Sequence, residues 1–415
     1  MGDVSDNPFG FALPGGQPPD PSDPQQMQRF LSQLQQLISS ASSGDPVNWD
    51  LARQVAAAHL STTGDPQVSP ADRDAVAEAL HLADLWLEPT TTMPSGITAS
   101  AAWNRNEWIY HTLEVWQKLC NPVAARMVGA MSDLVPEDAR AQLGPVQSMV
   151  ATLGGALFGG QLGQALGTLA AEVLSAGDIG LPLGPAGTAA LVPANIAGYG
   201  AGLEIEPDEV RLYVALREAA HQRLFGHVPW LRGHVLAAVE AYAAGITVDR
   251  EAIEEAMSRV DPGDPESMRQ LQVEGIFSPE ASPQQTAALT RLETALALIE
   301  GWVCHVVDAA AGGRLPNAAR LAETFRRRRA AGGPAEQTFA ALVGLELRPR
   351  RLREAAALWG ALTGHRGVAG RDALWGHPDL LPTEENFADP EGYARSGLDL
   401  DDLGDLDDLG GTGEP

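Results

Sequence analysis

The sequence predicts a mainly α-helical protein, and three observations support this. Two Ser-Pro pairs, Ser69-Pro70 and Ser282-Pro283, precede apolar residues at helical spacing, and Pro207 begins a third such run. A serine N-cap followed by proline in the first turn is a typical helix beginning. Strand patterns are nearly absent, because only Thr188–Ile196 has the composition of a short strand. We therefore expect helices that pack on one another around a shared core.

The composition limits the class of protein. The chain has 415 residues, of which 44% are hydrophobic, enough to bury a sizeable core. Its 54 acidic and 28 basic side chains give a formal net charge of −26, which argues against a nucleic-acid or anionic-lipid surface. Two cysteines are too few for a disulfide framework or a cysteine-rich zinc site. The first residues lack the pattern of a signal peptide, so we expect a cytoplasmic protein.

Charge and composition divide the chain into four parts. Residues 1–23 are rich in Gly and Pro, and residues 386–415 are strongly acidic, so both are expected to be disordered tails. Residues 24–92 are expected to form N-terminal helices that pack on the body, and residues 93–385 to form the body itself. The acidic tail either solubilises the protein or binds a basic groove on a partner.

The uncharged run 141–171 carries Gly155, Gly159, Gly163 and Gly167 at every fourth position. Such a ridge of small residues lets two helices approach closely, and it is known from helices in membranes. Glutamines within the run and its many glycines lower its hydropathy, which disfavours a membrane span. We expect a buried helix that packs backbone to backbone on a neighbour.

The helix expected after Pro207 carries the first candidate for chemistry. Glu218 and His221 lie three residues apart, so they share one face of the helix. This spacing is the second half of the H-E-x-x-H motif, in which two histidines bind zinc and the glutamate activates water. Arg217 occupies the position of the first histidine. A guanidinium cannot coordinate zinc and repels a divalent cation.

The helix expected after Ser282 supplies a second candidate. Glu300 lies among apolar residues, and a carboxylate on a buried face needs a metal or a cation as its partner. We therefore expect Glu300 to be the third ligand of a metallopeptidase-like site, or to pair with a cation. His305 and Asp308 follow on the same helix, and His227 lies six residues after His221. His227 also fits a purely structural place at a helix end.

Four segments resemble one known family: Arg217–Arg232, Leu298–Val303, Gly344–Ala355 and Trp375–Thr383. They are similar to actinobacterial zincin-like hydrolases, also called zinc-dependent metalloproteases, one branch of which is linked to coenzyme F420 biosynthesis. The resemblance covers roughly residues 90–385. It implies a mostly helical zincin-like fold with the site between two long helices.

The resemblance implies a zinc-dependent metallohydrolase that acts on a peptide or protein. Glu218 would be the general base, and His221 and Glu300 would bind zinc. Three further side chains could complete the ligand set: His227, His305 and Asp308. The alternative is a catalytically inactive scaffold or interaction protein, in which Arg217 pairs with Glu300 in place of the metal.

A basic run, Arg326–Arg329, ends a predicted helix. Four positive charges at the C-terminal end of a helix are favoured by the helix dipole. We expect a solvated helix end, or a docking site for the acidic tail.

Overall fold

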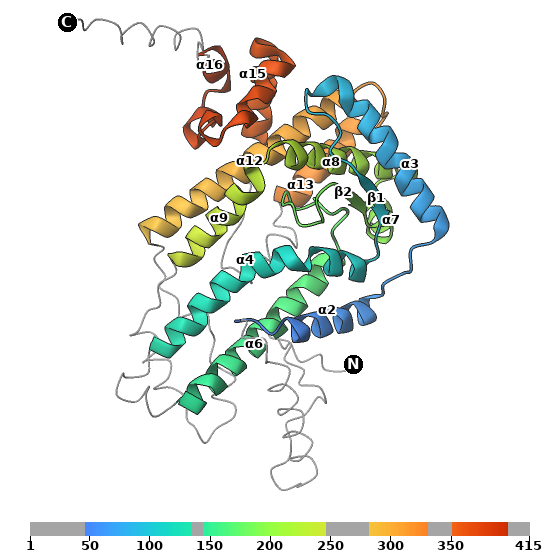
Figure 1. Cartoon of the computed structure of the whole chain (residues 1–415). Helices are drawn as coiled ribbons and strands as arrows, with labels where there is room; N and C mark the ends of the chain where they lie inside the picture. The colour runs from blue at the N-terminus through green and yellow to red at the C-terminus, as the bar shows by residue number, and fades with distance from the viewer. Residues whose placement is uncertain (1–45, 134–143, 246–281, 331–350, 397–415) are drawn as a thin grey trace, which may run out of the picture.

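The computed structural model describes residues 46–133, 144–245, 282–330 and 351–396, and it confirms a mainly helical protein (Figure 1). The predicted tail 1–23 and the acidic residues after 396 lie outside the described residues. The helices are α2 Trp49–Thr63, α3 Pro70–Leu87, α4 Arg105–Asp133, α6 Gly144–Ala170, α7 Pro193–Gly200, α8 Pro207–His227, α9 Leu231–Ala244, α12 Pro283–Ala311, α13 Ala318–Ala330, α15 Leu352–Asp372 and α16 Pro390–Arg395. Short 3₁₀ turns span Glu88–Thr90, Ala373–Gly376, Pro378–Leu380 and Glu384–Phe387.

The helix beginnings follow the expected capping chemistry. Ser69 accepts from the backbone N–H of Asp72, whose carboxylate accepts from the Ser69 N–H in return. Ser282 and Gln285 form the same reciprocal pair at the start of α12. Each capping box satisfies two backbone donors that the first turn leaves without partners.

The C-terminal boundary differs from the sequence prediction. The acidic tail was expected to begin at 386, whereas Pro390–Arg395 forms α16, which packs on α15. Asp389 caps this helix by accepting from the N–H of Gly392, and Arg366 donates to the carbonyl of Ala394. A local Asp-Pro helix beginning therefore outweighs the acidic composition of the segment.

Two short strands pair in parallel. β2 (Thr188–Leu191) lies within the predicted strand, and β1 (Ala99–Ala102) pairs with it in register from Ala99 opposite Thr188. On the other side of β2, Ser175 forms an antiparallel bridge with Leu191. β1 was missed because Ala-Ser-Ala-Ala contains no β-branched or aromatic residue, and tertiary pairing overrides that weak propensity.

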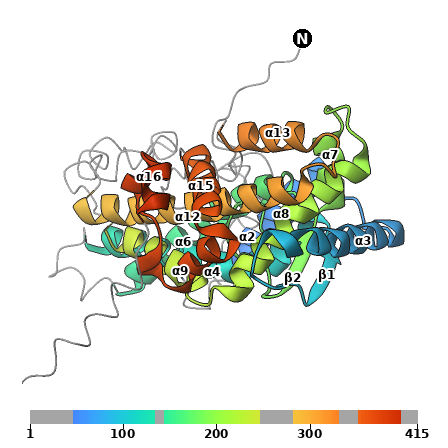
Figure 2. The same ribbon diagram turned by 90° about the horizontal axis from the view of Figure 1, so that it is seen from above.

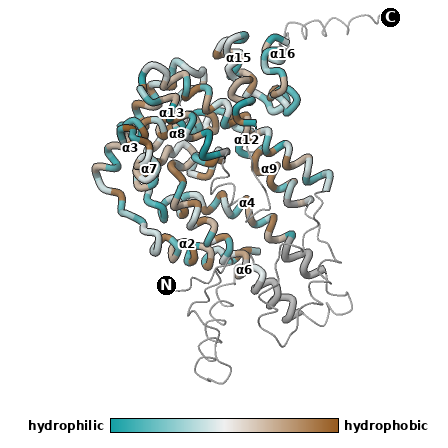
Figure 3. Tube along the Cα trace, turned by 180° about the vertical axis from the view of Figure 1, so that it is seen from behind, coloured by the Kyte–Doolittle hydropathy of each residue, from teal (hydrophilic) through white to brown (hydrophobic). Residues whose placement is uncertain are grey.

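The long helix α12 lies at the centre of the described structure, with α8, α9 and α15 packed on it (Figures 1 and 2). Among the described helices it alone has the length and hydropathy to span a membrane. However, 78% of its most apolar window is buried inside the protein, as in the core helix of a folded domain. Hydrophilic and hydrophobic residues alternate along outer helices such as α2 and α3 (Figure 3).

The glycine ridge of α6 packs directly on α2, as expected from its spacing. A Cβ added to Gly159 would lie 2.5 Å from the carbonyl oxygen of Asn48, and one added to Gly163 would lie 2.4 Å from that of Ala52. The N–H of Asn48 also donates to the carbonyl of Gly155 at 2.9 Å. The two backbones touch, so only glycine fits at the contact.

We expect Gly163→Ala to destabilise the protein by about 1–3 kcal/mol, because the added methyl group forces α2 away from α6. Gly160 is the matched control, since an added Cβ there meets no atom within 4 Å. Gly160→Ala should instead stabilise the helix, by about 0.5–1 kcal/mol. Urea unfolding of both variants measures the difference. An equal gain in stability for the two variants would contradict the close packing.

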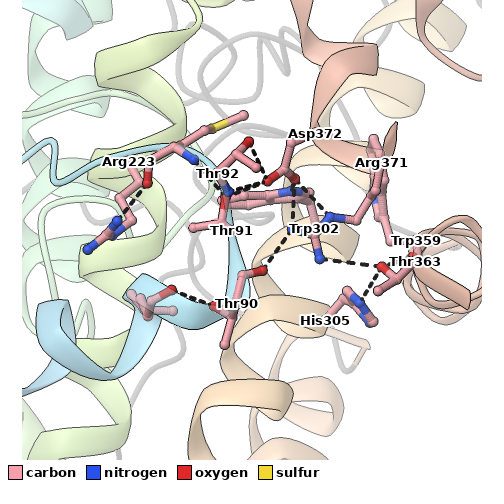
Figure 4. Close-up of polar contacts among 12 residues, drawn as sticks. Thr90, Thr91, Thr92, Arg223, Trp302, His305, Trp359, Thr363, Arg371 and Asp372 are labelled. Atoms are coloured by element: carbon pink, nitrogen blue, oxygen red, sulfur yellow. Dashed lines mark hydrogen bonds and ion pairs between the residues drawn. The ribbon is translucent and has the colours of Figure 1, made fainter. Parts of the chain in front are cut away.

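A buried polar network joins the loop after α3 to α12 and α15 (Figure 4). Asp372 accepts from Thr91 Oγ1 at 2.7 Å and from the N–H of Thr92 at 2.8 Å. Its other oxygen accepts from Trp302 Nε1 at 3.0 Å and from Arg371 Nε at 2.8 Å. Asp372 and its partners therefore connect three segments that are far apart in the sequence, and we call this network the Asp372 latch.

Candidate functional site

Helices α8 and α12 bring three of the predicted site residues into direct contact. Arg217 Nη2 donates to Glu300 Oε2 at 2.7 Å, and His221 Nε2 lies 2.8 Å from Glu300 Oε1. A fourth side chain, Arg329 of α13, places its Nη2 3.2 Å from the same Oε1. We call Arg217, His221, Glu300 and Arg329 the Glu300 cluster. The contact between Arg217 and Glu300 is the one that the sequence predicted as the alternative to a metal site.

Glu300 is the shared acceptor of this cluster, and its side chain is only 1% exposed. Burial alone would raise the pKa of the carboxyl group, but Arg329, His221 and Arg217 outweigh it and hold the pKa well below its ordinary range. The carboxylate is therefore ionised, and both of its oxygens contact partners within the protein. Two guanidinium groups neutralise this buried negative charge, which without them would strongly destabilise the folded state.

His221 has both ring nitrogens directed at oxygen atoms. Nδ1 lies 2.9 Å from the carbonyl oxygen of Arg217, one turn back on the same helix, and Nε2 faces Glu300. Both acceptors are satisfied when the ring carries a proton on each nitrogen, and in that state Nε2 has no free lone pair for a metal.

Glu218, the expected general base, is fully buried and makes separate contacts. Its Oε2 accepts from the N–H of Gly177 at 2.8 Å, and its Oε1 accepts from Gln222 Nε2 at 2.9 Å. Gln222 also donates to the carbonyl of Thr188 on β2. In this arrangement Glu218 fastens α8 to the segment before β2.

The segment that follows α6 lies directly against the cluster. A Cβ added to Gly177 would lie 3.0 Å from Glu218 Oε2, and one added to Gly180 would lie 2.7 Å from Glu300 Oε1. Gly180 also has a φ of +78°, a conformation that side chains disfavour. Glycine is therefore required at Gly180, and a side chain at Gly177 would press on the Glu218 carboxylate.

The last turn of α13 also packs against the cluster. The sequence predicted a solvated helix end here, and the structure differs from that prediction. Arg328 Nη1 donates to Asp178 Oδ2 at 2.9 Å, and Arg329 donates to the carbonyl of Asp178. Burial alone would raise the pKa of Asp178, but Arg328 and Arg329 outweigh it and hold the pKa below its ordinary range. Arg328 and Arg329 point inward because each pairs with a buried carboxylate, that of Asp178 and that of Glu300 respectively. Arg327 of the same turn is 78% exposed.

Phe325 of α13 covers the guanidinium of Arg217, which lies 5.0 Å from the centre of its ring. The ring also packs on Tyr199 and Tyr213, with centroids 5.1 Å and 5.4 Å away. On the other side, Arg217 Nη1 contacts Cys304 Sγ at 3.5 Å. Arg217 thus has ionic, aromatic and sulfur partners around a buried charge.

The three possible extra ligands lie away from the cluster. His227 is exposed, and its Nε2 faces the carbonyl of Ser95. His305 faces α15, where its Nε2 lies 2.8 Å from Thr363 Oγ1, and burial together with Arg371 lowers its pKa to about 4. Asp308 faces Arg326 at 3.8 Å.

The model of the family described as zincin-like metallopeptidase matches residues 47–394. The chain belongs to this family.

A solved structure described as "a putative hydrolase with a novel fold from Chloroflexus aurantiacus" has the same fold as this zincin-like chain, with a TM-score of 0.61 and 21% sequence identity. The match covers 84% of this chain and 98% of the other. A search of curated proteins finds no similar sequence.

Typical members of the zincin-like family use zinc, but the residues present here do not fit that ion. Of the motif's ligand positions, only His221 and Glu300 have side chains that could bind it, and each is engaged by a protein partner. Two guanidinium groups lie against Glu300. Across the part of the chain that the structure describes, no group of three His, Cys, Asp or Glu side chains is placed to hold a metal.

Sequence reasoning missed Asp178, Gly177, Gly180 and Arg329 as members of the site. A signal existed for two of them. Asp178 is an isolated acid within an apolar stretch rich in Gly and Pro, and Arg329 belongs to the basic run already noted. Only the fold shows that these two charges neighbour each other, because they lie 151 residues apart.

Proposed function

We propose that this chain is a metal-free zincin-like protein that has lost hydrolytic chemistry and acts as a binding scaffold. The observation that carries the proposal is the 2.7 Å ion pair between Arg217 and Glu300. A guanidinium occupies the position at which the motif has its first histidine, and it neutralises the carboxylate expected as the third ligand. The pair joins α8 to α12, the role that a metal would otherwise have.

The second candidate is a zinc-dependent metallohydrolase, which membership of the family favours. Glu218 would then be the general base, with His221 and Glu300 as ligands. For zinc to bind, Arg217 and Arg329 would both have to leave Glu300, and each would lose its carboxylate partner within a largely buried site. Breaking a buried ion pair in this way costs about 3–5 kcal/mol. This cost makes the metal-free scaffold the better supported function.

A scaffold of this kind would bind a peptide or protein partner through its apolar helices or its acidic C-terminal segment. The net charge of −26 supports a basic partner surface rather than nucleic acid or anionic lipid. The cytoplasmic location and the link to coenzyme F420 biosynthesis stay predictions.

Thermal unfolding with and without a chelator tests the proposal. A metal that binds only the folded state at a hundred times its Kd would stabilise it by about 2.7 kcal/mol, so its removal would lower the Tm by several degrees. We expect neither EDTA nor added Zn²⁺ to shift the Tm of the wild-type protein. His221→Ala is the control, because it removes the histidine that a metal would need. A drop in Tm on chelation that His221→Ala abolishes would overturn the proposal.

A further inference from the structure

A second cation contacts Glu300, and it comes from a different helix. Arg217 belongs to α8 and contacts Oε2, whereas Arg329 belongs to α13 and contacts Oε1. We propose that α13 blocks metal binding at this site independently of Arg217. Arg329 would exclude a divalent cation even when Arg217 is removed. This inference rests on the proposed function, because it requires a metal-free wild-type site.

Arg329 can block the site only if α13 is held in place, and hydrogen bonds anchor both ends of this helix. At its start, the N–H and side-chain amide of Asn317 donate to Glu209 in the first turn of α8, at 2.6 Å and 2.8 Å. At its end, Arg328 donates to Asp178 and to the carbonyl of Glu172, at 2.9 Å and 2.7 Å. Buried Phe325 fixes the middle of the helix. The anchored helix therefore holds Arg329 in one position.

The two oxygens of Glu300 are held separately, which makes the two arginines independent. Oε2 accepts from Arg217, while Oε1 lies within reach of both Arg329 and His221. Replacing Arg217 alone would free Oε2 but leave a full positive charge at 3.2 Å from Oε1. Charges at such distances in a buried site interact strongly, so a divalent cation would still be repelled.

Zinc titration of four variants separates the contributions of the two arginines. R217H restores the histidine of the motif and leaves α13 unchanged. R217H/R329Q also removes the second charge, R217H/R329K keeps that charge, and R217H/R327Q removes an exposed arginine of the same turn. We expect R217H/R329Q to bind Zn²⁺ about tenfold or more tightly than R217H. The other two double variants should bind as weakly as R217H.

Calorimetry with Zn²⁺ and the visible spectrum of bound Co²⁺ give readouts that need no catalytic activity. Equal affinity of R217H and R217H/R329Q, or no binding by any variant, would overturn the inference. Circular dichroism reports whether each variant is folded, and R217H/R329M is a replacement that keeps an apolar stem if the glutamine variant unfolds. Stoichiometric zinc in the wild-type protein would instead contradict the proposed function, so the two failures are distinguishable.

Discussion

Replacing Glu300 with glutamine is expected to reduce the free energy of unfolding by about 3–5 kcal/mol, because it leaves buried guanidinium groups without their counter-charge. Arg217 and Arg329 both pair with this carboxylate, and Phe325 covers the guanidinium of Arg217. Chemical denaturation followed by circular dichroism measures the loss. Glutamine keeps the volume of the side chain, so packing changes contribute little.

The matched control is Glu114→Gln, because Glu114 pairs with Lys118 on the exposed face of α4. Surface pairs of this kind contribute little, so no measurable change is expected. If Glu300→Gln were as stable as the control, the cluster could not be what joins α8, α12 and α13.

The pH dependence gives a second check on the same residue. The pKa of Glu300 is held well below its ordinary value of 4.5. The stability that its charge contributes is therefore complete above the pKa of the unfolded state, and it is lost as the pH falls below about 4.5. Glu300→Gln has no such group, so its stability should fall less steeply over that acidic range.

Replacing Asp372 with alanine is expected to cost about 3–5 kcal/mol, through the loss of the Asp372 latch. Its carboxylate accepts from Thr91, Thr92, Trp302 and Arg371. Its removal leaves the buried Trp302 indole N–H without this acceptor and the buried Arg371 without its counter-charge. The loop after α3 would lose its attachment to α12 and α15. Denaturation measures the cost, and limited proteolysis within this loop should become faster.

Asp379→Ala is the control for this variant, because Asp379 is an exposed carboxylate a few residues further along the chain. It should leave both the stability and the proteolysis rate unchanged. A latch variant that resists protease as well as the wild-type protein does would show that other contacts hold the loop.

The parts of the fold that depend on local signals were predictable from the sequence. Ser69, Pro207 and Ser282 begin or cap helices where their chemistry indicates, and the glycine spacing in α6 predicted a close helix contact. The pairing of Arg217 with Glu300 was one of two outcomes that the sequence left open, since a buried carboxylate needs either a metal or a cation as its partner.

Contacts that depend on helix rotation and on distant segments were not predictable in the same way. His305 lies five residues after Glu300, which turns it about 140° around α12 toward α15. Arg329 is far from both of its carboxyl-bearing neighbours in the sequence, and nothing local indicates whether a basic helix end points outward or inward. The N-terminal strand β1 has no propensity signal at all.

The zinc content of the purified full-length protein tests the central claim most directly. Elemental analysis by plasma mass spectrometry, after growth with added zinc and gel filtration, should give far less than one zinc per chain. The ion pair between Arg217 and Glu300 would then hold the place of the metal. One zinc per wild-type chain, lost in His221→Ala, would contradict it.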